Sequence, residues 1–191
     1  MAQRQLFGIP QQLPAGMLYQ TEFISPHEEA ELIAIIRTLP LEEAKYREFT
    51  AKRRIVTYGG TYDFSAHELH PAGPIPEFLH PLRQRIAHWA GVDASKFTHS
   101  LIAEYGTGTQ LGWHRDVPDF EVVAGVSLAS AARMRMRPYP PKKGRNPDAI
   151  SVQLEARSAY ILRGEARWNW QHSIPTTKAL RYSITFRTLR S

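Results

Sequence analysis

The sequence predicts an α+β protein that is mainly β, built as a sandwich or jelly roll with helices in its N-terminal part. Two observations lead to this prediction. From Phe97 onward, eight short runs of β-branched, aromatic and aliphatic residues alternate with turn residues within about 90 residues, which is typical of sandwiches and jelly rolls. Before Phe97, two segments instead combine helix caps with helical spacing of their apolar residues.

Both predicted helices have clear start or stop signals. In the first, Ser25 is a good cap, Pro26 suits the first helical position, and Glu28 completes a capping box. The second is expected to begin near Pro76 and to end at Gly91. We expect both helices to buttress the sheets through their apolar faces, which are formed by Leu32, Ile35, Ile36 and Leu39 in the first and by Leu79, Leu82, Ile86 and Trp89 in the second.

Between the helices, residues 53–64 predict a strand, a turn at Gly59-Gly60 and a second strand, as in a hairpin. No repeat or linker divides the chain. We therefore expect one domain over residues 1–191, with the helices and the hairpin in 1–96 and the β core in 97–191. The predicted strands of the core are 97–105, 110–116, 122–129, 132–138, 149–155, 158–163, 167–172 and 180–189.

Composition narrows the chemistry. The chain has 191 residues and a net charge of +6. It has no cysteine, and this excludes disulfide scaffolds, iron-sulfur clusters and thiol nucleophiles. Any metal must therefore be bound by His, Asp or Glu. Residues 131–191 hold 13 Lys or Arg against 3 Asp or Glu, so the basic character lies in the C-terminal third. No apolar run approaches the roughly 18 residues of a membrane span, and the N-terminus lacks a signal-peptide core, so we expect a cytoplasmic protein without membrane partners.

A candidate metal site begins with His114 and Asp116. Residues two apart in a strand point the same way, so this imidazole and this carboxylate should converge. A turn-stabilising Asp beside a surface His is the alternative for this pair alone. In a jelly roll, His172 could return beside the pair, and two His with one carboxylate form the facial triad of non-haem Fe(II) oxygenases, with three coordination positions left open.

The last strand adds an independent indication. Alternation places Arg181, Ser183, Thr185 and Arg187 on one face and the intervening apolar residues on the other. Such a row could pair with Glu inside a barrel or face water. Two buried arginines without a partner would be costly, so either this face is wet or a dicarboxylate is bound there.

These residues together resemble the AlkB family of Fe(II)- and 2-oxoglutarate-dependent dioxygenases. The resemblance covers roughly residues 50–190 and includes GWHRD (112–116), VVAGVSLA (122–129) and RYSITFR (181–187). It implies a double-stranded β-helix, a variant of the jelly roll, with helices packed on one side. It also implies an enzyme that needs Fe(II), 2-oxoglutarate and O₂, and that hydroxylates a carbon attached to nitrogen so that an aldehyde and the unmodified amine are released.

The resemblance further implies roles for individual residues. His114, Asp116 and His172 would be the catalytic iron ligands. Two departures concern the cosubstrate: Ala103 and Ser183 stand where the family commonly has Asn. We expect 2-oxoglutarate binding to survive, with Ser183 as a shorter polar substitute. The other cosubstrate residues would be Tyr105 and Arg181 at the distal carboxylate and Arg187 at the end nearer the metal.

The expected substrate is alkylated DNA or RNA. The segment Tyr58-Gly-Gly-Thr-Tyr62, preceded by Arg53 and Arg54, resembles the nucleotide-recognition lid of the family, although its tyrosines could equally pack on the core. Trp113 is expected in the core or at the pocket mouth, so Arg53, Tyr58, Tyr62 and Trp113 are the candidate substrate-binding residues. Other basic residues suit either a phosphate track or a solvated face, namely Arg133, Arg135 and Arg137 in one strand and Lys142, Lys143 and Arg145 in the next loop.

Two alternatives stay open on the sequence alone. The same oxidising site could act on a protein side chain or a small molecule. The chain could also be a nucleic-acid-binding β domain without catalysis, which predicts that the three triad side chains do not converge. No obligate protein partner is evident. Glu165 and Arg167 are expected to form a local ion pair near the site, and His99 is expected at the surface or on a helix.

Overall fold

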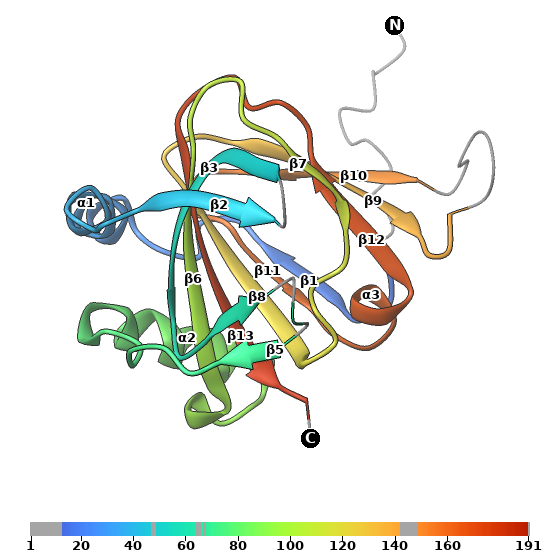
Figure 1. Ribbon diagram of the computed structural model, residues 1–191, viewed down its shortest axis with the longest axis horizontal. Coiled ribbons are helices and arrows are strands. Elements are labelled where there is room, and N and C mark those ends of the chain that lie inside the picture. Colours follow the sequence, from blue (N-terminus) through green and yellow to red (C-terminus); the bar gives the residue numbers. More distant parts are fainter. Residues whose placement is uncertain (1–12, 47–48, 64–65, 67, 142–148, 191) are drawn as a thin grey trace, which may run out of the picture.

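Two antiparallel sheets face each other in the computed structural model, which describes residues 13–46, 49–63, 66, 68–141 and 149–190 (Figure 1). The larger sheet has the order β1-β11-β8-β13-β6-β3-β2 and the smaller one the order β10-β9-β12-β7. The larger sheet contains β1 (Met17–Gln20), β2 (Glu42–Tyr46), β3 (Phe49–Tyr58), β6 (Phe97–Tyr105), β8 (Phe120–Leu128), β11 (Ala159–Leu162) and β13 (Arg181–Leu189). The smaller contains β7 (Leu111–His114), β9 (Ala132–Pro138), β10 (Ile150–Leu154) and β12 (Trp170–Ile174). This arrangement confirms the predicted mainly β jelly roll.

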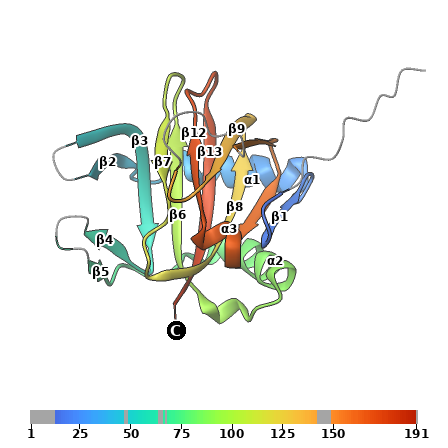
Figure 2. The ribbon, with the colours of Figure 1, turned by 90° about the vertical axis from the view of Figure 1, so that its right-hand side faces the viewer.

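The two predicted helices cover the outer face of the larger sheet (Figures 1 and 2). In α1 (Pro26–Ile36), Ser25 accepts a hydrogen bond from the Glu28 backbone and donates its own backbone N–H to the Glu28 carboxylate, as the capping box predicts. α2 (His80–Ala90) follows a short 3₁₀ turn, η1 (Glu77–Leu79), and ends at Gly91 in the left-handed conformation. A second 3₁₀ turn, η2 (Ala94–Lys96), leads into β6. None of the described helices is long and apolar enough to cross a membrane.

Strand alternation in β13 separates the core from the site. Ile184 and Phe186 are fully buried in the cluster that α1 and α2 cover. Arg181 and Thr185 point the other way, into the space between the sheets. A second apolar cluster, which includes Met134 and Met136 of β9, fills the rest of that space. The alternation predicted from RYSITFR is therefore present.

The N-terminal half differs from the prediction in its strand pairing. The strands on either side of Gly59-Gly60 exist, but β3 pairs with β2 and β6, whereas β4 (Thr61–Asp63) pairs with β5 (Glu68–His70) in a separate small sheet. The predicted hairpin is wrong because Gly59, at φ +79°, packs directly against the Thr98 carbonyl, and the chain turns away from β3 there. β1, β2 and β5 were not expected at all. Phe64, Lys142, Lys143 and Arg145 lie outside the described residues.

The predicted strand 167–172 is partly wrong as well. A short helix, α3 (Gly164–Trp168), comes first, and β12 begins only at Trp170. Gly164 has φ +53°, a conformation that lets the chain turn from β11 into the helix. The displaced start leaves His172 in the middle of β12 rather than at a strand end.

Candidate metal centre and cosubstrate cavity

The smaller sheet brings His114, Asp116 and His172 together, and we call these three residues the triad. His114 ends β7 and is paired in register with His172 of β12, while Asp116 lies two residues after His114. One ligand atom of each residue lies within 4.8 Å of the others. The His172 Nε2 atom is 3.9 Å from Asp116 Oδ2, and the two imidazole centroids are 4.2 Å apart. This convergence contradicts the non-catalytic alternative.

A bulge in β7 supports this geometry. The register between β7 and β12 shifts between the His172–His114 and Ile174–Leu111 pairs. Simple alternation would place Leu111 and His114 on opposite faces, yet both line the space between the sheets. Trp113 is correspondingly turned to the outer face.

The protonation states of the triad suit a metal. Burial lowers the pKa of His114 and lowers the pKa of His172 to about 3, so both imidazoles are neutral near pH 7. Burial alone would raise the pKa of Asp116, but the Arg187 guanidinium and the two histidines outweigh burial and lower this pKa well below its usual range. Two neutral imidazoles and one carboxylate form the donor set that divalent iron requires.

Arg187 orients Asp116 and is itself held by His99. Its Nε donates to Asp116 Oδ1 at 2.8 Å, and its terminal nitrogen lies 3.3 Å from His99 Nδ1. Because arginine can only donate, this ring nitrogen of His99 accepts. Burial and the Arg187 charge lower the pKa of His99 to about 3, consistent with a neutral ring that packs against the Phe120 ring at an angle of 44°. The surface position expected for His99 is wrong, since only 4% of the residue is exposed.

A small cavity of about 50 Å³ extends from the triad along the inner face of the larger sheet. Arg181, 2% exposed, donates from Nε to Ser127 Oγ at 2.9 Å and lies 5.0 Å from the Tyr105 ring centroid. Among the described residues lining this cavity, the acidic one is Asp116, which pairs with Arg187. The Arg181 charge therefore lacks an acidic partner, and a buried cation of this kind suits an anionic ligand. Ala103 and Ser183 also line the cavity.

Arg53 belongs to this cavity rather than to a lid alone. Its terminal nitrogen donates to the Tyr105 hydroxyl at 3.2 Å, and the residue is 8% exposed. Burial alone would raise the pKa of Tyr105, but the charges of Arg53 and Arg181 lower it below its ordinary value. Two guanidinium groups thus flank one phenol. Tyr160 of β11, which the sequence analysis missed, is buried in the same wall.

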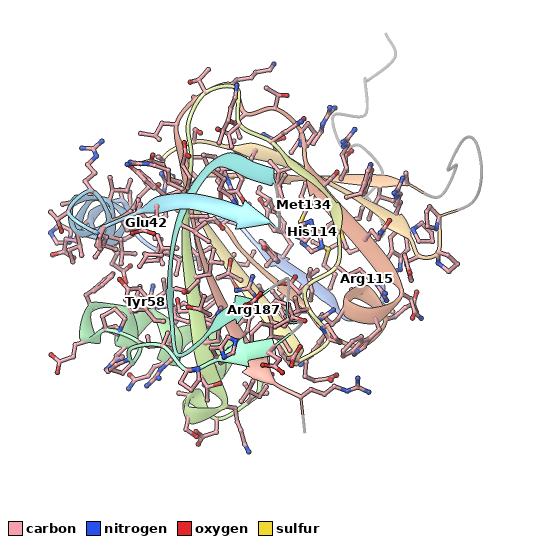
Figure 3. The ribbon with its side chains drawn as sticks, in the orientation of Figure 1. Glu42, Tyr58, His114, Arg115, Met134 and Arg187 are labelled. Atoms are coloured by element: carbon pink, nitrogen blue, oxygen red, sulfur yellow. The ribbon has the colours of Figure 1, made fainter. Side chains whose placement is uncertain are left out.

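A much larger groove, about 970 Å³, adjoins this cavity at the triad, and His114, Asp116 and Arg187 line both. It lies between β2, β3 and β4 on one side and β7 with the following loop on the other, and Tyr62 and Trp113 contribute to its walls. Tyr58 does not, because it packs against the apolar cluster under α2, as the alternative interpretation of the tyrosines predicts. In Figure 3, Tyr58 lies away from His114 and Arg187, which point into the space between the sheets.

Arg167 has a different role from the one expected. It is 2% exposed, and one terminal nitrogen donates to the carbonyls of Asp116, Val117 and Phe120 at 3.2, 2.7 and 2.8 Å. Its ring contact is Trp168, at 4.3 Å. The predicted ion pair with Glu165 is therefore wrong, since Glu165 instead accepts from Trp170 Nε1.

The family comparison agrees with this site. Residues 16–187 match the model of the 2OG-Fe(II) oxygenase superfamily, and the chain belongs to that superfamily. It is 28% identical over 184 residues to the alkylated DNA repair protein ALKBH8 homolog of Arabidopsis thaliana, a match that covers 85% of this chain and 51% of that protein. The chain thus spans about half the length of that relative.

A second curated relative is also of the AlkB type, and a solved structure shares the fold. The mouse alpha-ketoglutarate-dependent dioxygenase alkB homolog 4 is 24% identical over 209 residues, with 92% of this chain and 68% of that protein covered. The structure of OsALKBH1 superposes with a TM-score of 0.69 at 15% identity, covering 93% of this chain and all of that one, which shows a shared fold. The chain is therefore an AlkB-type member of the superfamily. Its enzyme class, a 2-oxoglutarate-dependent dioxygenase with Fe(II), 2-oxoglutarate and O₂, is confirmed.

Proposed function

We propose that this chain oxidatively removes alkyl groups from nucleic-acid bases. The observation that carries the proposal is the groove of about 970 Å³, which reaches His114 and Asp116 of the triad and is much larger than the adjoining cavity that Arg181 lines. A base that has been turned out of its strand needs room of this kind, while the cosubstrate needs a separate enclosed site. The name of the Arabidopsis relative, an alkylated DNA repair protein, supports this substrate class.

The proposed roles of individual residues concern the metal and the cosubstrate. The triad residues hold Fe(II) and leave three coordination positions open. Arg181 and Tyr105 bind the distal carboxylate of 2-oxoglutarate, with the Ser183 hydroxyl as an additional donor. Arg187 lies at the metal end, where it also keeps Asp116 oriented.

The iron, with 2-oxoglutarate and O₂, would supply the oxidising chemistry that hydroxylates an alkyl carbon bound to a base nitrogen. The protein positions the base and excludes water. Tyr62 offers an aromatic face in the groove, which the apolar Leu111 and Val117 also line. Arg53, placed between groove and cavity, lies where base and cosubstrate would approach each other.

The acidic wall of the groove favours a cationic substrate. Glu42 and Glu43 of β2 line the groove and are exposed. Alkylation at a ring nitrogen of adenine or cytosine leaves a positive charge on the base, which these carboxylates complement. The same wall would fit an alkylated ammonium group of a protein side chain, so oxidation of such a side chain is the second candidate.

The test is succinate release after anaerobic loading with Fe(II) and 2-oxoglutarate. Methylated single-stranded DNA, methylated RNA, a methyl-lysine peptide and no substrate are compared on addition of O₂. We expect one of the two nucleic acids to raise succinate release well above the peptide and the blank. His114→Ala and Asp116→Ala should abolish this release while the fold is retained.

The matched control is His27→Ala, because His27 is an exposed residue of α1 whose side chain is 82% accessible. It should behave like the unmodified chain. If only the methyl-lysine peptide raises succinate release, the second candidate function, oxidation of a protein side chain, is supported instead. Unchanged turnover in His114→Ala and Asp116→Ala would rule out the proposed iron ligands.

A further inference from the structure

The outer face of the smaller sheet carries a row of arginines. Arg133, Arg135 and Arg137 of β9 point outward because Met134 and Met136, which alternate with them, are buried between the sheets. Their spacing is about 6.6 Å, two residues of strand. The residues that face them in register are uncharged: Arg135 lies between Ser151 and Ser173, Arg133 is opposite Gln153, and Arg137 is opposite Gln171.

Two of these guanidinium groups are held in place by neighbours on the same face. Arg135 Nε donates to Ser173 Oγ at 3.2 Å and Arg137 Nε to Gln171 Oε1 at 3.0 Å. Both groups lie over the Trp113 ring, 5.0 and 4.3 Å from its centroid. Within the described part of the chain, neither forms an ion pair, so their terminal nitrogens remain available for an anion.

A second cation–aromatic pair continues the row. Arg115 lies 3.7 Å from the Tyr139 ring centroid, and it is anchored by a bond to the Trp168 carbonyl at 2.9 Å. Tyr139 is 42% exposed. On other faces, arginines such as Arg54 and Arg85 are paired with glutamates. We call Trp113, Arg115, Arg133, Arg135, Arg137 and Tyr139 the basic face.

The basic face is continuous with the groove. Trp113 and Arg115 contribute to both, because β7 is the edge strand of the smaller sheet. His114 points inward to the triad, whereas Trp113, one residue earlier, points outward beneath the arginines. A strand that leaves the groove over this edge therefore passes directly onto the basic face.

We propose that the basic face binds the sugar-phosphate backbone of a single-stranded nucleic acid beside the target nucleotide. This inference rests on the proposed function and extends it. Flat guanidinium groups without acidic partners suit phosphate oxygens, and the exposed Tyr139 ring beside them suits an unpaired base. An acidic protein would use the charges but would leave the exposed Tyr139 ring unused.

The test compares Arg133→Gln/Arg135→Gln/Arg137→Gln with a control that loses the same charge elsewhere, Arg37→Gln/Lys96→Gln/Lys178→Gln. These three control residues are exposed on other elements. Binding of a fluorescent single strand of about 16 nucleotides is measured as a function of salt. In the basic-face variant the slope of log K against log salt should fall by about 2, at about 0.7 per lost phosphate contact. The control should keep its slope.

Measurements of succinate release distinguish two outcomes: that the basic face does not bind nucleic acid, and that the proposed function itself is wrong. The ratio of kcat/KM for the methylated 16-nucleotide strand to that for a methylated dinucleotide should fall about tenfold or more in the basic-face variant. An unchanged ratio and slope, with both substrates still turned over, would overturn the basic face alone. If neither nucleic acid is turned over by the unmodified chain, the proposed function fails. Equal displacement of the strand by polyglutamate of the same charge would also overturn the inference.

Discussion

Gly125 shows how tightly single residues are fitted around the cavity that Arg181 lines. It lies in β8 opposite Thr185 of β13, and a Cβ atom built on it would come within 2.6 Å of the Tyr160 hydroxyl oxygen. Tyr160 is 8% exposed and lies in the cavity wall. Burial raises the pKa of this phenol to about 12, so it stays protonated and acts as a neutral wall of the cavity.

We predict that Gly125→Ala pushes the Tyr160 ring into the cavity. Overpacking of this kind costs about 1–3 kcal/mol of stability. The KM for 2-oxoglutarate should rise about tenfold or more, equivalent to about 1.4 kcal/mol, because the space of the diacid is reduced. Urea unfolding and initial rates at varied 2-oxoglutarate measure the two effects.

A variant with a smaller side chain at position 160 provides the control. Tyr160→Leu in the Gly125→Ala background should restore the KM, so that the double variant binds 2-oxoglutarate better than the sum of the single changes predicts. Additive effects would show that Gly125 acts elsewhere than on Tyr160.

Individual residues were predictable where a spacing and an alternation agreed. Arg181 and Arg187 share one face of β13, as the alternation predicts. His114 and Asp116 converge as predicted, but the strand expected over 110–116 ends at His114, so the loop rather than strand alternation places Asp116. The same alternation from Tyr105 back to Leu101 would have placed His99 inside, and this signal was missed. Alternation from His114 places Trp113 on the opposite face, as found, whereas no local signal reports the bulge that puts Leu111 on the same face as His114.

At the scale of elements, α3 is tied to the loop between β7 and β8 by one side chain. Arg167 of α3 donates to three carbonyls of this loop, including that of Asp116. The loop carries a triad residue but has no regular structure of its own between His114 and Phe120. Arg167 therefore fixes the backbone from which the Asp116 carboxylate extends.

We predict that Arg167→Leu destabilises the fold by about 2–3 kcal/mol and weakens metal binding, because buried carbonyls lose their donor. Arg167→Lys should recover part of both, since it keeps the charge but not the planar group. Urea unfolding measures the first effect, and titration with Co(II), followed by its visible absorption, measures the second. Metal affinity equal to that of the unmodified chain in Arg167→Leu would show that the loop is held by other contacts.

Some boundaries of helices and strands could be predicted from neighbouring residues, whereas the pairing of one strand with another could not. The capping box at Ser25 and the strand at Phe97–Tyr105 depend on neighbouring residues, and both are found where predicted. The pairing of β3 with β6 depends on residues more than 40 positions apart, which no local pattern reports. The sequence also failed to predict α3. Trp168 and Trp170 favour a strand because aromatic residues are common in strands, but α3 starts at Gly164, four residues before Trp168.

At the scale of the whole molecule, the site is divided between the sheets. His114 and His172 of the triad belong to the smaller sheet and Asp116 to the loop after β7, whereas Arg53, Tyr105, Arg181 and Arg187 belong to the larger sheet. A metal on the triad and a diacid on Arg181 would together connect the two sheets. The jelly-roll class could be predicted from the number of short strands. The distribution of the site residues over two sheets could be seen only once the order of the strands was known.

We predict that metal and 2-oxoglutarate together stabilise the chain more than either alone. At 100 times its Kd, a ligand adds about 2.7 kcal/mol, which is a rise in Tm of about 5–10 °C for a chain of this size. Differential scanning calorimetry with Mn(II), with 2-oxoglutarate and with both measures the effect, and EDTA should remove it.

Arg181→Met serves as the matched variant, because it removes the distal anchor and leaves the triad intact. It should keep the rise caused by Mn(II) and lose the additional rise caused by 2-oxoglutarate. An equal additional rise in both proteins would show that the diacid does not use Arg181.

The position of β13 between β6 and β8 affects how the chain is made. Residues 181–189 complete the middle of the larger sheet, although β6 and β8 are synthesised long before them. Until these residues leave the ribosome, both earlier strands present open hydrogen-bonding edges and uncovered apolar side chains to solvent or to a chaperone. The nascent chain must therefore be kept from aggregating until its last strand is inserted, and a ribosome that stalls before Arg181 releases no native sheet.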